Sequence, residues 1–144
     1  MTTIVMNTLN SAVTEYNWSF QSITPTHAGS ATGIYLLGGD IDDTANIDAR
    51  VVTGLTEWGS SLKKFVGMVY FALVGEGYGT LIVQTPDDEY AYDFPVRSSG
   101  QSREKPGRGI RENYLAFGFS NIDGADFRMD RIEVLIKEST TRRV

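Results

Sequence analysis

The sequence contains no cysteine and only one histidine, and this excludes several kinds of site. Among the 144 residues there is no Cys, and His27 is the single His. A disulfide, a thiolate nucleophile and a zinc site built on sulfur ligands are therefore excluded. A Ser-His-Asp triad would have to use His27, which stands in a segment rich in Pro, Ser and Thr with no nucleophile-elbow sequence nearby. We predict a surface histidine, no enzymatic activity, no catalytic residues and no cofactor.

Long apolar runs and an excess of basic residues are also missing. The longest apolar run, residues 65–74, is interrupted by Gly67 and is shorter than the roughly 18 residues that a membrane helix needs. Residues 1–10 carry no basic cluster and no apolar stretch of signal-peptide length. The formal net charge of −5 weakens attraction to phosphate backbones. We therefore predict cytoplasmic synthesis, with neither a membrane nor a nucleic acid as partner.

The residues that are plentiful favour β-structure. The chain has 15 Gly, 7 Tyr and 7 Phe, with many Thr and Val. Aromatic and β-branched side chains pack well on a pleated surface, and glycine allows tight turns between short strands. A chain of this length falls within the usual size of one domain with one hydrophobic core. We predict a single all-β domain over residues 1–144.

Alternation of apolar and polar residues predicts about eight to ten strands. The clearest span residues 11–20, 33–38, 47–53, 63–74, 80–85, 89–95, 110–120 and 127–136. The strand at 63–74 is apolar on both faces, so we expect it to be central and covered twice, by a second sheet and a loop or by another subunit. Glycines at 75–79 predict a hairpin that starts a three-stranded meander, and Asp123-Gly124 predicts the turn before the last strand. The fold predicted is an antiparallel, jelly-roll-like β-sandwich, with a small β-barrel as the alternative.

Two groups of residues are candidates for binding a partner. Residues 98–109 are polar, rich in Gly and free of large apolar side chains, which predicts a mobile surface loop. The basic residues in and beside this loop suit an acidic patch on another protein, although a solvated loop with no partner has the same pattern. The aromatic residues of the chain suit the core or an interface, with a sugar-stacking platform as the alternative. The partner-binding residues predicted are Arg97, Arg103, Lys105, Arg108, Arg111 and Trp58.

An acidic stretch at residues 40–48 resembles a calcium-binding loop at first sight. Its oxygen-bearing side chains are Asp40, Asp42, Asp43, Asn46 and Asp48. With Asp40 in the first position of an EF-hand loop, Ala45 stands where Gly is needed and Val51 where the bidentate Glu belongs. We therefore predict no metal site, and a solvated turn is the expected structure, with a looser calcium site as the open alternative.

The C-terminal third contains Gly-Arg-Gly at 107–109 before an aromatic strand, Asn-Ile-Asp-Gly-Ala-Asp-Phe at 121–127, and Arg-Arg at 142–143. This pattern resembles the closing β-hairpin of small virion proteins of tailed bacteriophages. Earlier segments that fit the same pattern are 12–16, 48–54 and 63–70. The resemblance covers most of the chain, but it is a pattern of turns and strands and transfers no catalytic or ligand residue.

The resemblance implies a structural component of a phage particle, associated with the tail, baseplate or attachment region and present in several copies. The partners it implies are other virion proteins, and further copies of this chain in a symmetric homo-oligomer. Apolar side chains that a single domain leaves exposed can be buried in such an assembly. The alternative prediction is a carbohydrate-binding or capsid-decorating module that recognises host-surface glycans through loop aromatics and carboxylates.

Overall fold

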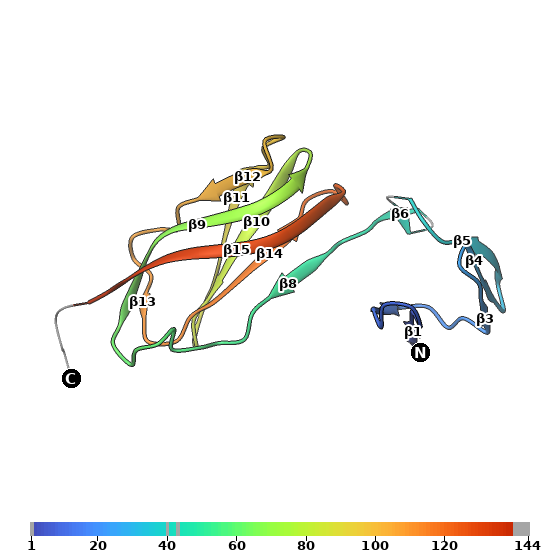
Figure 1. Ribbon diagram of the computed structural model, residues 1–144, viewed down its shortest axis with the longest axis horizontal. Coiled ribbons are helices and arrows are strands. Elements are labelled where there is room, and N and C mark those ends of the chain that lie inside the picture. Colours follow the sequence, from blue (N-terminus) through green and yellow to red (C-terminus); the bar gives the residue numbers. More distant parts are fainter. Residues whose placement is uncertain (1, 40, 43, 140–144) are drawn as a thin grey trace. The chain divides into compact units, whose positions relative to one another are not determined.

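The structure, a computed structural model, describes residues 2–39, 41–42 and 44–139. These residues form fifteen β-strands and no helix (Figure 1). The chain divides into two compact units, here called unit 1 (Met1–Gly39) and unit 2 (Asp40–Val144). All residues of the large hydrophobic core belong to unit 2. The core predicted for the whole chain is thus built from its last two thirds.

Unit 1 consists of two small antiparallel sheets. Its strands are β1 (Thr3–Met6), β2 (Val13–Tyr16), β3 (Ser22–Ile23), β4 (His27–Ser30) and β5 (Gly33–Leu36). The strands β1 and β2 form a hairpin, and β3, β4 and β5 form a three-stranded meander. Between these strands, Trp18 meets Tyr35 at 4.8 Å between ring centroids, and Tyr16 meets Phe20 at 5.4 Å. Aromatic side chains therefore form a contacting cluster within unit 1.

Unit 2 is a sandwich of two antiparallel sheets, preceded by a short hairpin. The hairpin strands are β6 (Ile41–Asp42) and β7 (Ala45–Asn46), and the sandwich strands are β8 (Arg50–Val52), β9 (Lys64–Gly75), β10 (Tyr78–Gln84), β11 (Glu89–Pro95), β12 (Gln101–Glu104), β13 (Arg111–Glu112), β14 (Ala116–Asn121) and β15 (Phe127–Glu138). One sheet has the order β11-β10-β14-β8. In the other, β9 pairs with β15 on one side and with β12 and β13 on the other. Figure 1 shows these two layers.

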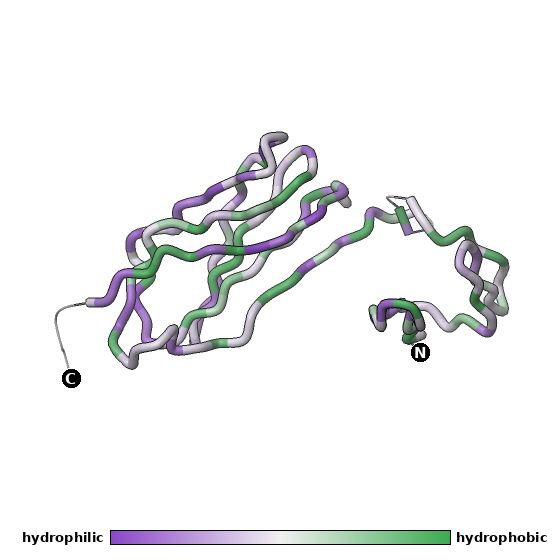
Figure 2. The backbone as a smooth tube through the Cα atoms, viewed as in Figure 1, coloured by the Kyte–Doolittle hydropathy of each residue, from purple (hydrophilic) through white to green (hydrophobic). Residues whose placement is uncertain are grey.

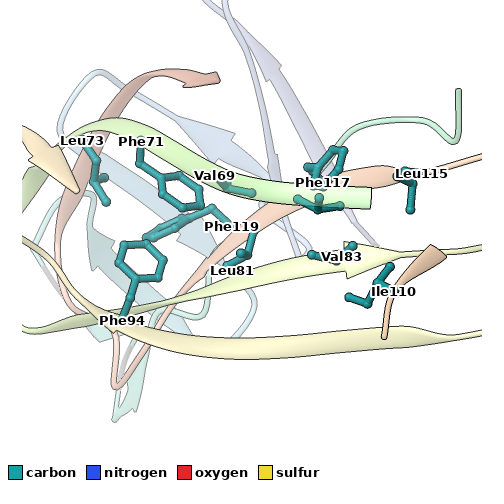
Figure 3. Packing of buried hydrophobic residues seen from close by; sticks show 11 residues of the cluster. Val69, Phe71, Leu73, Leu81, Val83, Phe94, Ile110, Leu115, Phe117 and Phe119 are labelled. Carbon is teal, nitrogen blue, oxygen red and sulfur yellow. The ribbon is translucent and has the colours of Figure 1, made fainter. Parts of the chain in front are cut away.

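The core lies between the two sheets and is rich in phenylalanine. The Phe71 and Phe94 rings stack with 4.7 Å between centroids, and Phe119 lies 4.7 Å from Phe127. These four rings come from β9, β11, β14 and β15, so both layers contribute. Figure 3 shows Phe71, Phe94 and Phe119 within the core. The predicted all-β sandwich is confirmed, and the described strands form no closed barrel.

The central strand β9 changes face part-way along its length. Its inward side chains are Val66 and then Val69, Phe71 and Leu73, so the alternation slips by one residue between 66 and 69. The pairing register with β15 is irregular at the same place. A β-bulge of this kind leaves one residue unpaired and bends the strand. Within the sandwich, the second sheet covers only one of the two apolar faces that the sequence predicted to be covered.

Two predicted hairpins are wrong. The segment 63–74 does not pair with 80–85, because β9 and β10 belong to different sheets, and the same is true of β14 and β15. The apolar residues of successive strands, such as Phe71 and Leu81, thereby face each other across the core instead of lying side by side in one sheet. The turn glycines Gly77 and Gly124 have φ of 72° and 71°. A positive φ suits a tight connection between sheets as well as a hairpin, so these residues could not distinguish the two.

The segment predicted as a structureless loop contains a strand. Residues 101–104 form β12 and pair with β9 from Val69 to Ala72. Ser102 is fully buried, and its Oγ accepts a hydrogen bond of 2.9 Å from the backbone N–H of Arg97. Backbone pairing and a small buried hydroxyl hold this strand in place, and neither produces an apolar pattern. The mobility predicted for residues 98–109 stays a prediction.

Candidate functional site

The outer face of the sheet centred on β9 presents an apolar stripe to solvent. We call it the β9 outer face, and its members are Phe65, Met68, Tyr70, Ala72 and Val74 of β9 together with Leu135 of β15. Val74 is 54% exposed, Leu135 48% and Phe65 36%, while the other three members are half-buried. A Cβ placed on Gly67 would lie 3.4 Å from Leu135 Cδ2, so this leucine lies across the bulge. The stripe follows the central strand of the sheet.

Charged side chains border the stripe on both long sides. Tyr70 stands opposite Arg103 of β12 and opposite Glu133 of β15 in the two pairing registers. Both neighbours are exposed, and Arg131 Nη2 lies 3.0 Å from Glu133 Oε1 in an ion pair on the β15 side. Protein interfaces have this anatomy, with an apolar centre and a polar rim.

The predicted basic residues lie along one edge of this sheet. Arg103 is in β12, whereas Arg97, Lys105 and Arg108 are exposed in the connections that flank it. No ion pair among the described residues involves any of these four. Arg111 differs, because its guanidinium lies 4.9 Å from the Phe65 ring centroid and its Nη2 donates to Ser139 Oγ. Arg103 and Arg111 thus border the β9 outer face, and the other three extend the same basic edge.

Trp58 belongs to a second exposed aromatic group, carried by connecting loops. It has a φ of 48°, a left-handed conformation that residues other than glycine rarely adopt. The indole Nε1–H donates to the Leu115 carbonyl at 2.8 Å, and the ring packs edge-on against Phe117 at 5.4 Å. The side chain is nevertheless 39% exposed. Trp58 is therefore fixed in orientation with part of its ring open to solvent.

Tyr114 and Glu57 form a hydrogen-bonded pair in the same two loops. Tyr114 Oη donates to Glu57 Oε1 at 2.7 Å, and Tyr114 is 43% exposed. The hydrogen bond to the carboxylate, with its negative charge, raises the pKa of Tyr114 above its ordinary value. Carboxylates and aromatic rings are the groups that sugar-binding sites combine, so this loop pair is chemically suited to a glycan.

A buried lysine holds these loops together, and no pattern of residues marks it in advance. Lys64 is fully buried, and its Nζ donates to the carbonyls of Ser60, Leu62 at 2.8 Å and Asn113 at 3.1 Å. Ser60 and Leu62 follow Trp58 in the chain, and Asn113 precedes Tyr114. Buried charges need such compensation by polar partners. In sequence, Lys64 looks like its exposed neighbour Lys63, so only the fold distinguishes them.

The described part of the acidic stretch and the histidine belong to no metal-binding group. Asp40 and Asp43 lie outside the described residues, and no group of three or more His, Asp or Glu among the described residues could hold a metal ion. His27 is exposed in β4, as predicted, with Nδ1 lying 3.0 Å from Thr26 Oγ1.

Comparison with known proteins adds no family to these observations. No family model, no curated protein and no solved structure matches this chain. In the part of the chain that the structure describes, no helix is long and apolar enough to cross a membrane.

Proposed function

We propose that this protein is a structural component of a bacteriophage virion, associated with the tail, and that it assembles with other virion proteins through the β9 outer face. The observation that carries this proposal is the apolar stripe along the centre of that sheet, bordered by Arg103 on one side and by Arg131 and Glu133 on the other. The resemblance of the chain to small virion proteins of tailed phages supplies the biological setting.

The arrangement of the stripe is more typical of a protein interface than of isolated apolar residues on a solvent-exposed surface. Scattered exposed apolar side chains are ordinary, but a contiguous apolar patch with a polar rim is typical of a site where another protein binds. Phe65, Tyr70 and Val74 follow one another along a single strand face. A docked protein would bury these side chains, and the bordering charges would fix its orientation.

Incorporation into particles tests this proposal. The substitution Val74→Glu places a carboxylate in the stripe. We expect particles to incorporate at least roughly tenfold less of this variant than of the unmodified chain. The reason is that an unpaired buried charge costs well over the 1.4 kcal/mol that corresponds to a tenfold change in binding. Leu55→Glu is the matched control, because Leu55 is 47% exposed in a loop of unit 2. Equal incorporation of both variants, or absence of the unmodified chain from particles, would contradict the proposal.

The second candidate function is glycan recognition, which the loop site favours. Trp58 presents an oriented, partly exposed ring close in sequence to the paired Glu57 carboxylate. If this is the function, saturable binding on a glycan array is lost in Trp58→Ala, whereas Val74→Glu binds normally. The assembly proposal predicts no saturable sugar binding by any of these proteins.

A further inference from the structure

Unit 1 is almost free of charge. Of the 13 Lys and Arg and 18 Asp and Glu side chains in the protein, only Glu15 falls within residues 1–39. Every Lys and Arg side chain belongs to unit 2. On the surface of a soluble domain, about a quarter to a third of the residues commonly carry charged side chains. The surface of unit 1 is therefore unlike that of a unit selected to remain in water.

The hairpin of unit 1 exposes apolar side chains on its outer face. Ile4 and Met6 alternate with the half-buried Thr3 and Val5, and they are 69% and 60% exposed. Met6 pairs with Val13 of β2, which is 64% exposed. One face of the hairpin is thus turned inward, while the other presents an apolar surface.

The three-stranded sheet of unit 1 has the same character. Ile34 and Leu36 of β5 are 81% and 69% exposed, and Tyr35 between them turns into the aromatic cluster. The register places Ile34 opposite Gly29 of β4, a residue without a side chain to cover it. Hydrophobic stretches, green in Figure 2, recur along the strands of this unit.

Unit 1 has little interior to hold it together. Ala28 is its only fully buried residue among those described. Units of about 40 residues generally need disulfides, a metal or oligomerisation to be stable. The chain has no Cys, and its described residues offer no metal-binding group. Association of the exposed apolar faces would supply stability that this small interior does not.

We infer that unit 1 is a self-association element, whose apolar outer faces bind the same faces of unit 1 in a second copy of this chain. The scarcity of charge on unit 1 favours a second copy of unit 1 as the partner. A strongly charged partner would find no opposite charge to pair with, whereas two copies of unit 1 bring together apolar surfaces that carry only Glu15. Such an interface uses the same patch on both copies, as a two-fold symmetric contact requires. The inference deepens the proposed assembly function by naming one partner, but it concerns a different surface from the β9 outer face.

Sedimentation equilibrium of the full-length chain tests the inference. The unmodified protein is expected to show a mass that is a multiple of 15.9 kDa, falling toward 15.9 kDa on dilution. Ile34→Glu and, independently, Met6→Glu should shift the dissociation constant upward by at least roughly tenfold. Leu55→Glu is the control, since Leu55 is 47% exposed in a loop of unit 2, and it should associate as the unmodified chain does.

A second measurement covers the case in which a variant fails to fold. In a Trp58→Phe background the only tryptophan is Trp18, which packs against Tyr35. Dilution of this otherwise unmodified chain should shift the Trp18 emission to longer wavelength as the oligomer dissociates. A mass of 15.9 kDa at all concentrations up to about 1 mM, with constant Trp18 emission, would overturn the inference.

The outcomes separate this inference from the proposed function. A chain that associates through unit 1 but is absent from particles would support the inference and contradict the virion proposal. A chain that enters particles through the β9 outer face, yet is monomeric when purified, would do the reverse.

Discussion

Replacing Lys64 by methionine removes the charge that joins two loops of the sandwich. The ammonium group donates to three backbone carbonyls and is fully buried, so the substitution keeps a side chain of similar length but leaves the Ser60, Leu62 and Asn113 oxygens without this donor. We expect a large loss of stability together with loosening of the loops that carry Trp58 and Tyr114.

The magnitude follows from the hydrogen bonds lost. Each bond from a charged donor contributes about 1.5–3 kcal/mol, and bonds that share one donor are not additive. Methionine recovers part of this through apolar burial, which leaves an expected loss of roughly 3–5 kcal/mol. A domain of this size is stable by about 5–15 kcal/mol in total, and each kcal/mol moves Tm by about 4 °C. Lys64→Met should therefore melt roughly 12–20 °C below the unmodified protein.

Urea unfolding followed by circular dichroism, together with thermal melts, measures the effect. Lys63→Met is the matched control, because Lys63 is half exposed and its ion pair with Glu112 spans 3.9 Å in solvent. Such pairs contribute about 0–1 kcal/mol, so the control should melt within a few degrees of the unmodified chain. If Lys64→Met and Lys63→Met unfold at the same urea concentration, the reasoning about the buried ammonium is refuted.

Three further predictions concern the same unit. Gly118→Ala should cost about 1–3 kcal/mol in urea unfolding, because its Cβ would lie 2.4 Å from the Val51 carbonyl oxygen, whereas Gly109→Ala, with nothing within 4 Å, should unfold like the unmodified chain. Phe119→Ala should cost about 3–5 kcal/mol in the same assay, because it empties the centre of the phenylalanine cluster. The Glu57 carboxylate raises the pKa of Tyr114 above 10.0, so the pair stabilises the folded chain below that pH and loses this contribution as pH rises through the raised pKa. In an ultraviolet titration, one tyrosine of the Glu57→Gln variant should ionise at lower pH than in the unmodified chain. An unchanged titration curve would contradict the pairing.

The strands rich in apolar and aromatic residues were predicted most reliably from the sequence. The strand expected at 89–95 is β11 with the same bounds, and the one expected at 63–74 is β9, shifted by one residue at each end. The pattern of apolar residues is a property of a single strand, so it identifies where a strand lies but not which strand it pairs with. The pairing of β9 with β15, more than fifty positions later, depends on which layers face each other, and the two wrong hairpins come from that limit.

The surfaces proposed to bind partners are visible in part from the sequence. The apolar outer side of β9 was visible as a strand apolar on both faces, and the basic residues beside it were identified, although Arg111 proved to be held by Phe65 and Ser139. The strand β12 was missed because no large apolar side chain marks it. The scarcity of charge in residues 1–39 was present in the sequence and would have been found by counting charges segment by segment.

The most direct measurement of the central claim uses the absence of cysteine. A single Cys introduced as Val74→Cys on the β9 outer face, or as Leu55→Cys in the loop, is the only thiol in the chain. The account predicts that, within assembled particles, a maleimide reagent modifies Val74→Cys at least roughly tenfold more slowly than in the free protein, while Leu55→Cys reacts at similar rates in both. Equal reactivity of Val74→Cys in the free and assembled states would contradict the claim that this face is the assembly interface.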